Sequence, residues 1–276
     1  MILLLGGSGV LGTALQEKLI SHEITLVSRE NVMKWMCKDG PSHIEAFIEG
    51  LSIKPSLIVN AAGMTNPLAL ESELLATNYQ LPINLIKAGK PYRARIVTFG
   101  SIMEEMLNSS MSNKYLESKQ LFRNFLTSGD AEASNFLHLQ IHTWYGGVRL
   151  GEHMFLGQLL RSIKETSPFE MSEGRQLREY HHIHDDMKAV VELVSQNSFG
   201  IHQINHGEPY SLRDIAEHLL GAFSLKQLLR LGTLPTPIDD NFNLHFARPE
   251  NLQHIQFRPT LSGLLKDFQE RLEWSV

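Results

Sequence analysis

The sequence is poor in cysteine: Cys37 is the single cysteine in 276 residues. One thiol excludes an intramolecular disulfide framework and is typical of proteins kept in a reducing compartment, so we expect a cytoplasmic location. Long hydrophobic runs are also missing, and the apolar start at Met1 to Leu5 is far too short to cross a bilayer. Because this start leads directly into glycines rather than into a cleavage site, we expect neither a membrane span nor a signal peptide.

Clustered basic charge is absent as well. The chain has 25 Lys and Arg against 30 Asp and Glu, for a formal net charge of -5. A surface that binds nucleic acid needs clustered basic residues, so we expect no nucleic-acid partner. The remaining composition, with 42% hydrophobic and 20% charged residues, is ordinary for a globular protein of one large domain or a domain with a lobe.

A glycine-rich turn follows the apolar N-terminal run and precedes an apolar-periodic segment. This order predicts a buried parallel strand, a tight turn and a helix. Positions without side chains let backbone N–H groups approach a pyrophosphate, and the helix N-terminus adds a positive dipole end. The spacing is Gly-x-x-Gly-x-x-Gly, so this segment taken alone is also explained by an ordinary tight turn. The cofactor-binding residues predicted here are Gly6, Ser8, Gly9, Val10, Leu11 and Gly12.

Tyr115 and Lys119 stand four positions apart in the sequence. A helix places positions i and i+4 on one face, so the ammonium can lie beside the phenol and make this weak acid available near neutral pH. Such a pair is suited to giving a proton to a carbonyl. Taken alone, Tyr115 is better explained as a half-buried structural tyrosine, but together with the N-terminal glycines the pair indicates a dinucleotide-dependent enzyme.

With these features the chain resembles the extended short-chain dehydrogenase/reductase family, whose members act mainly on nucleotide-linked sugars. Further motifs stand in the family's order: Asn60-Ala61-Ala62-Gly63 after an apolar run, Asn78, Arg95 to Ser101, Thr143-Trp144-Tyr145-Gly146, Arg178 to Asp186, and Gly200 to Ser211. The resemblance implies that Ser101, Tyr115 and Lys119 are catalytic. It also implies cofactor contacts from Asn60, Ala61, Ala62, Gly63, Asn78, Tyr115 and Lys119.

The expected fold is α/β, a Rossmann-type doubly wound parallel sheet with a smaller, interleaved C-terminal lobe. Alternating strand and helix patterns in the first half predict such a sheet. The resemblance divides the chain into an NAD(P)-binding domain, residues 1–146 with about 174–208, and a substrate-binding lobe, about 147–173 with 209–276. Strands are expected at 1–5, 23–28, 57–60, 95–99 and 136–141, and helices after Gly9 and at 42–50, 71–88 and 113–128.

The end of the second expected strand bears on the choice of cofactor. NAD enzymes place a carboxylate there for the adenosine ribose, whereas a 2′-phosphate repels a carboxylate and attracts a guanidinium. The sequence Ser28-Arg29-Glu30 therefore favours NADP, with Arg29 against the phosphate and Ser28 beside it. A solvated Arg29, with Glu30 serving the ribose of NAD, stays the alternative. Asp39 resembles the acidic residue that contacts adenine in the family.

Departures from the family's sub-patterns narrow the reaction. Sugar 4,6-dehydratases carry an Asp-Glu pair after the catalytic Thr, but Ile102 and Met103 follow Ser101 and cannot transfer protons. A dehydratase is therefore not expected. Epimerase-reductases of the GDP-fucose synthase kind have a cysteine where this chain has Met103, which argues against a double epimerisation.

Three residues are implied as substrate contacts: Thr143, His153 and Arg178. Arg178 resembles the arginine that pairs with a substrate diphosphate, since a guanidinium engages two phosphate oxygens at once. Arg178 could instead form a structural salt bridge to Glu179, Asp185 or another acid. His153 could instead be an ordinary surface histidine.

No metal site is predicted. His181, His182 and His184 are close in sequence, but His182 and His184 alternate on an expected strand, and no cysteine or well-spaced carboxylate completes a tetrahedral set. The function expected is an NADP-dependent reductase of a nucleotide-linked 4-keto-deoxysugar, working as a homodimer as the family usually does. The alternatives are an NAD-dependent nucleotide-sugar 4-epimerase and an NADP-binding regulatory or sensor protein without turnover.

Overall fold

The computed structural model describes residues 1–66, 68–105, 113–129, 135–147, 149–238 and 240–273. The chain forms two compact units, Met1–Ile141 with Met187–Ile204, and His142–Asp186 with Asn205–Val276. Residues 174–186 lie in the second unit, whereas the family resemblance groups them with the sheet.

The first unit is built on a six-stranded sheet whose strands all run parallel. In sheet order the strands are β10 (Gly200–Gln203), β5 (Phe136–Ile141), β4 (Arg95–Ser101), β3 (Leu57–Asn60), β1 (Ile2–Leu5) and β2 (Ile24–Leu26). The order reverses between β1 and β3, where Leu5 pairs with Asn60. Open α/β sheets bind ligands beyond the carboxyl ends of the strands at such a point. The expected doubly wound parallel sheet is confirmed.

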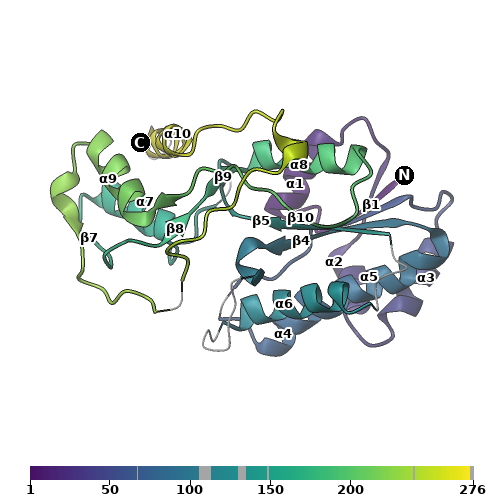
Figure 1. Ribbon diagram of the computed structural model, residues 1–276. Coiled ribbons are helices and arrows are strands. Elements are labelled where there is room, and N and C mark those ends of the chain that lie inside the picture. The colour runs from purple at the N-terminus through teal and green to yellow at the C-terminus, as the bar shows by residue number, and fades with distance from the viewer. Residues whose placement is uncertain (67, 106–112, 130–134, 148, 239, 274–276) are drawn as a thin grey trace. The chain divides into compact units, whose positions relative to one another are not determined.

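Helices cover both faces of this sheet, with α1 and α8 on one face and α2, α3, α5 and α6 on the other (Figure 1). β1 and most of β3 are apolar because a strand covered on both sides has no face for water. The helices are α1 (Val10–Lys18), α2 (Arg29–Trp35), α3 (Gly40–Glu49), α4 (Glu71–Leu75), α5 (Leu81–Gly89), α6 (Lys114–Thr127) and α8 (Ile183–Ser195), with a π-helix η1 (Ala76–Gln80) and 3₁₀ turns η2 (Lys90–Tyr92) and η3 (Ile102–Glu105).

Local hydrogen bonds decide where several helices begin. Asn113 Oδ1 accepts the Leu116 N–H at 3.2 Å and so caps α6, and Ser28 Oγ accepts the Asn31 N–H at 3.2 Å and so caps α2. The sequence analysis does not foresee α2, because a helix of seven residues is too short to show a clear helical period. The single helix expected at 71–88 is found as α4, η1 and α5 in succession.

The main core of the first unit lies between the sheet and helices on one of its faces. Leu3 and Leu5 of β1 pack in one buried cluster with Ile44 and Ile48 of α3 and with Phe122 of α6. Truncating one such side chain to alanine costs about 2–5 kcal/mol, so this packing holds the strand ends in place.

The second unit pairs short strands and packs three helices around its own core. Its elements are β6 (Thr143–Tyr145) beside β9 (Tyr180–His182), β7 (Phe169–Glu170) beside β12 (Leu229–Arg230), β8 (Leu177–Arg178) beside β11 (Tyr210–Ser211), helices α7 (Phe155–Glu165), α9 (Leu212–Ala222) and α10 (Thr260–Glu273), and turns η4 (Lys226–Leu228) and η5 (Glu250–Leu252). His182 ends β9, but His184 lies in the first turn of α8, so the expected strand through both histidines is wrong. None of the helices in the described segments has the length and apolar content that a bilayer-spanning helix needs.

Candidate functional site

Close backbone approaches shape the glycine turn after β1. Gly6 has a φ of +72°, and a Cβ at this position would lie 2.6 Å from Ala62 N. A Cβ on Gly12 would lie 2.6 Å from Gly7 Cα. A side chain at position 6 or 12 would therefore push apart the turns that follow β1 and β3, or the turn and α1.

The first amides of α1 are suited to an anion. No side chain caps this helix, and Gly9 at its N-cap donates its own N–H to the Gly6 carbonyl at 2.9 Å. The first N–H groups of a helix have no acceptor within it, and the helix dipole favours negative charge beside them. These amides belong to Val10, Leu11 and Gly12, and Ser8 is exposed next to them. The glycine turn, which lets backbone approach closely, and the unpaired N–H groups at the start of α1 together fit a dinucleotide pyrophosphate.

Two asparagines hold the turn after β3. Asn60 Oδ1 accepts the Ala62 N–H at 3.2 Å. Asn78, on η1, accepts the Met64 N–H at 3.0 Å and donates to the Met64 carbonyl at 2.9 Å and to Ser118 Oγ at 3.0 Å. Asn78 thus joins this turn to α6, and its π-helical position is of a kind that recurs at functional sites. The neighbouring backbone at residues 61–63 is partly buried or exposed and can face a ligand.

The segment after β2 leaves a guanidinium free. Ser28 Oγ caps α2, and Arg29 is exposed, with neither a hydrogen bond nor an ion pair to any described residue. Glu30 instead pairs with Lys34 at 2.8 Å, and this hydrogen bond lowers the pKa of Glu30. Asp39 is exposed at the N-cap of α3 and makes no capping bond. Arg29 is therefore the side chain at this position that can meet a phosphate.

The predicted catalytic residues come from β4 and α6. Helix α6 carries Tyr115 and Lys119 one turn apart. Lys119 Nζ donates to the Phe99 carbonyl at 2.7 Å, which fixes α6 against β4. Ser101 ends β4, and its Oγ accepts the Met103 N–H at 3.2 Å. The structure thus holds Lys119 against the last part of β4, which ends at Ser101, with Tyr115 one turn earlier on the same helix.

Glu104, which the sequence reasoning missed, lies beside this set. One carboxylate oxygen accepts the Ser101 N–H at 2.5 Å, and the other lies 3.3 Å from His138 Nε2. His138 Nδ1 lies 2.8 Å from Thr98 Oγ1. The side chains of Glu104 and His138 are both 0% exposed, so a buried polar chain runs from β4 and β5 to Ser101. A Cβ on Gly100 would collide with Glu104 and His138, which explains the glycine there.

The pKa shifts in this group follow from burial and from Glu104. Burial, and then the charge of Glu104, raises the pKa of Tyr115 far above its ordinary value. Burial lowers the pKa of Lys119, against the opposing effect of Glu104. Burial acts to raise the pKa of Glu104, but His138, Lys119 and the Ser101 N–H together hold it below its ordinary value. The shift of the Tyr115 pKa is opposite to the one expected from a neighbouring Lys119 ammonium.

The sequence of β5 contains a signal for part of this buried polar network. Leu137-His138-Leu139-Gln140 alternates apolar and polar residues in a strand that is covered on both faces, and His138 and Gln140 are both fully buried. A buried polar residue needs a hydrogen-bond partner. The sequence therefore indicates that partners exist, but it does not indicate that Glu104 is one of them.

The predicted substrate residues all lie in the second unit. Thr143, on β6, lines a cavity together with Trp144, Arg149 and Tyr180. His153 is exposed. A polar hydroxyl and a cation beside aromatic walls can orient a sugar or a phosphate.

Arg178 has an internal partner. Its Nη2 lies 2.7 Å from Asp240 Oδ1, and the two side chains are 24% and 12% exposed. The acid is therefore Asp240 rather than Glu179 or Asp185, the acids that lie nearest in sequence. Partial exposure leaves room for a ligand oxygen to join or to replace this ion pair.

Comparison with known proteins places these features in a family. The model of the "NAD dependent epimerase/dehydratase family" matches residues 2–207. A search of curated protein sequences finds no significant match.

Several solved structures have the same fold. UDP-N-acetylglucosamine 4-epimerase from Methanobrevibacter ruminantium M1, in complex with UDP-N-acetylmuramic acid, superposes with a TM-score of 0.75 at 16% identity, over 99% of this chain and 97% of that chain. RMD from Pseudomonas aeruginosa, complexed with NADPH, gives a TM-score of 0.73 at 16% identity over 98% of this chain and 99% of that chain. UDP-glucose 4-epimerase from Thermus thermophilus, complexed with NAD, gives 0.73 at 16% identity over 100% of this chain and 99% of that chain.

Proposed function

The chain belongs to the NAD dependent epimerase/dehydratase family, and from this premise we propose that it is an NADP-dependent reductase of a nucleotide-linked 4-keto-deoxysugar. Membership confirms the resemblance to NAD(P)-dependent enzymes of the extended short-chain dehydrogenase/reductase type. Three points of the proposal go beyond family membership: the direction of the reaction, the preference for NADP over NAD, and the type of sugar.

One observation carries the proposal: α6 is fixed against β4, with Tyr115 and Lys119 beside the strand end that bears Ser101. A phenol of ordinary pKa, about 10, already holds its proton at neutral pH, and the surroundings of Tyr115 raise its pKa further. A general acid must be protonated before the reaction starts. This state suits reduction of a ketone, in which the oxygen receives a proton.

Each of the three side chains has its own role in the proposed reaction. When bound, the dinucleotide supplies the hydride. Tyr115 gives its proton to the ketone oxygen of the substrate, and the Ser101 hydroxyl donates a second hydrogen bond as negative charge develops there. Lys119 has donors left besides the one bound to Phe99, and its ammonium stabilises negative charge on the phenol after proton transfer.

Arg29 supports NADP as the cofactor. It is exposed and has no internal partner in the described chain, whereas Glu30 is engaged with Lys34. A guanidinium can bind two oxygens of a phosphate with parallel hydrogen bonds. The 2′-phosphate of NADP can therefore bind the Arg29 guanidinium, and the nearby Glu30 carboxylate is already paired with Lys34.

The cavity beside Thr143 and the partly exposed Arg178 support a substrate that carries phosphates. We propose that Arg178 binds the diphosphate and that Thr143 contacts the sugar. His153 is exposed in the same unit and is proposed as a further contact to a sugar hydroxyl. One of the similar structures is a complex with UDP-N-acetylmuramic acid, which supports a nucleotide-linked substrate.

The test is oxidation of NADPH with a panel of dTDP-, UDP-, GDP- and CDP-linked 4-keto-6-deoxysugars. Wild type is compared with Tyr115→Phe and with Tyr92→Phe. Tyr92 is the matched control because its hydroxyl bonds Glu49 at 2.6 Å and it precedes β4 rather than following it. We expect Tyr115→Phe to lower kcat about 100- to 10,000-fold, the usual contribution of a positioned proton donor, while Tyr92→Phe keeps full activity.

Other outcomes assign the alternatives. Interconversion of a nucleotide sugar and its C4 epimer with NAD, without net cofactor use, identifies a 4-epimerase, and two of the similar structures are 4-epimerases. Tight NADPH binding with no turnover in wild type and in Tyr115→Phe identifies a regulatory or sensor protein. Equal turnover by wild type and Tyr115→Phe refutes the role of the phenol.

We also propose a homodimer in a reducing compartment, the cytoplasm. Helix α6 exposes Leu121, and the segment before α4 exposes Leu68 and Leu70, which together offer apolar surface near the Tyr-Lys helix. The single cysteine, Cys37, is free and exposed, as is common where thiols stay reduced. Light scattering of wild type and Leu121→Glu tests the dimer, since a charge in an apolar interface separates the subunits.

A further inference from the structure

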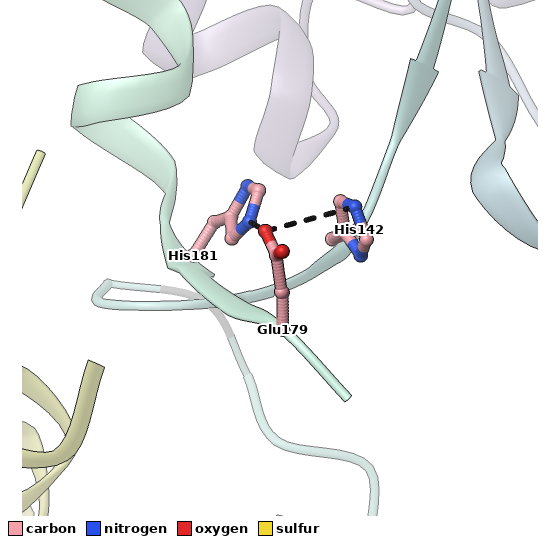
Figure 2. A group of neighbouring side chains, drawn as sticks. All are labelled: His142, Glu179 and His181. Carbon is pink, nitrogen blue, oxygen red and sulfur yellow. Dashed lines mark hydrogen bonds and ion pairs between the residues drawn. The ribbon is translucent and has the colours of Figure 1, made fainter. Parts of the chain in front are cut away.

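Two histidines of the second unit converge on the buried carboxylate of Glu179. His142 stands between β5 and β6, Glu179 between β8 and β9, and His181 within β9. Figure 2 shows the carboxylate of Glu179 between the two imidazole rings. Glu179 Oε2 lies 3.0 Å from His181 Nε2 and 3.8 Å from His142 Nε2. The side chains of His142, Glu179 and His181 are 6%, 1% and 0% exposed, so water does not screen their charges.

A second carboxylate faces the other nitrogen of His181. Asp186 Oδ1 lies 3.0 Å from His181 Nδ1, and Asp186 Oδ2 accepts the Trp144 indole N–H at 2.7 Å. A neutral imidazole has one N–H, so one of its two nitrogens would direct a lone pair at a carboxylate. The mismatch is removed by a second proton on His181, by a proton on one of the two carboxylates, or by a metal ion.

The charge balance favours the metal ion. Neither Glu179 nor Asp186 forms an ion pair with a lysine or arginine of the described chain. His206 Nε2 lies 3.1 Å from Asp186 Oδ1 and can donate a hydrogen bond to it. A proton on His181 adds one positive charge beside the two carboxylates, whereas a divalent cation compensates both. Uncompensated charge is costly in a buried site, because the interior solvates it poorly.

We propose that His142, Glu179 and His181 bind a divalent transition-metal ion, with Zn²⁺ as the expected occupant. Their three ligand atoms all lie within 4.8 Å of one another. A tetrahedral ion with bonds of about 2.0–2.2 Å holds its ligand atoms about 3.3 Å apart, so shifts of about 1 Å complete the geometry. Asn205 Oδ1, 2.9 Å from His142 Nε2, offers a fourth ligand.

The surroundings match those of a metal-binding histidine. Such a histidine donates its other ring N–H to a carboxylate, and His181 Nδ1 has Asp186 in this place. Glu179 is itself held by the N–H groups of His206 at 2.8 Å and Gly207 at 3.2 Å. These contacts direct His181 Nε2 and Glu179 Oε2 toward each other, where the ion would displace a proton.

The ligand types and the burial define the class of site. Imidazole nitrogens suit Zn²⁺ or Co²⁺, whereas Mg²⁺ and Ca²⁺ prefer oxygen ligands throughout. A four-coordinate site that is closed to water is structural rather than catalytic. The ion would join the segment at His142 to β9 and to Asn205, and so stabilise the second unit. Ser101, Tyr115 and Lys119 belong to the first unit, so this inference does not rest on the proposed reductase function.

Titration of the chelator-treated full chain with Zn²⁺ alone tests the site. The measurements are binding stoichiometry by calorimetry and the visible absorption of the Co²⁺ form, which reports tetrahedral coordination. The variants are His142→Gln at a ligand, Asp186→Asn at the outer partner, and His245→Gln, an exposed histidine of the same unit, as the matched control. NADPH turnover is recorded separately.

We expect one Zn²⁺ per wild-type chain and a tetrahedral Co²⁺ spectrum. Asp186→Asn should weaken binding about 10- to 100-fold, as loss of an outer partner does, and His142→Gln should weaken it more, while His245→Gln leaves it unchanged. No binding by wild type, or equal binding by His142→Gln, overturns the proposal. The wild-type stoichiometry and Co²⁺ spectrum decide the question even if a variant fails to fold.

Discussion

Replacing Glu104 by glutamine should destabilise the first unit measurably. Glutamine keeps the size of the side chain but removes the charge that now accepts the Ser101 N–H at 2.5 Å and faces His138 Nε2 at 3.3 Å. Hydrogen bonds to charged groups contribute about 1.5–3 kcal/mol, and those between neutral groups about 0.5–1.5 kcal/mol. With about 1 kcal/mol lost at each contact, the free energy of unfolding should fall by about 2 kcal/mol.

The pH dependence gives this prediction a sign. The pKa of Glu104 lies below its ordinary value of 4.5 in the folded chain. Its contribution is therefore fully present above the unfolded pKa and is lost as the pH falls through the folded pKa. The stability difference between wild type and Glu104→Gln should be complete above about pH 5 and should shrink below about pH 4.

Urea unfolding followed through tryptophan fluorescence, to which Trp35, buried in the first unit, contributes, measures this difference. The matched control is Glu105→Gln, because Glu105 is partly exposed and pairs with Arg123 at 3.3 Å. An ion pair at such a site contributes about 0–1 kcal/mol, so the control should change little. Equal stability of wild type and Glu104→Gln at neutral pH, or a difference that persists undiminished in acid, would refute the reasoning.

The same substitution should also move the pH profile of the reaction. The charge of Glu104 contributes to the raised pKa of Tyr115, so its removal lowers that pKa. Reduction requires the protonated phenol, and kcat is lost as the pH rises through the pKa of Tyr115. The alkaline loss of kcat should therefore begin at a lower pH in Glu104→Gln than in wild type. An unchanged alkaline limb contradicts the electrostatic link between the two residues.

Three further predictions concern ligand binding. Gly12→Ala should weaken NADPH binding at least about tenfold in calorimetry, because its Cβ would press on the turn that cradles the pyrophosphate, while Gly50→Ala, whose Cβ meets ordinary contacts, should not. Arg29→Ala should raise the Kd of NADPH about tenfold and leave that of NADH unchanged, and an equal effect on both contradicts the phosphate contact. Arg178→Ala should raise KM for the nucleotide sugar about tenfold without changing NADPH affinity, and an unchanged KM assigns Arg178 to structure alone.

The sheet of the first unit was predictable because its strands have a simple requirement. Helices cover both faces, so β1 and most of β3 are apolar, and the expected strands at 57–60 and 136–141 agree with the structure to the residue. The helix expected at 113–128 is also found, and the structure gives the reason for its start, since the Asn113 side chain caps the helix that carries Tyr115. Glycines at positions 6 and 12 likewise mark a place where backbones must approach.

The second unit was less predictable because its contacts are distant in sequence. Several of its strands are two residues long, too short for any period to appear. The partner of Arg178 illustrates the difficulty: nearby acids at 179 and 185 are obvious candidates, yet the ion pair is made with Asp240, which packing of the chain brings from far along the sequence. Local pattern cannot distinguish such partners, since each is an equally charged carboxylate.

Buried polar clusters show where pattern reasoning stops and where function is to be sought. A charged side chain is stable in the interior only with compensating partners, so the burial of Glu104 and Glu179 implies such partners. For Glu104 the partners, His138 and the Ser101 N–H, connect the acid to the predicted catalytic end of β4. For Glu179 the balance stays incomplete with the described side chains and one proton, and an ion completes it. The two clusters lie in different units, so loss of metal binding and loss of reduction should be separable by substitution.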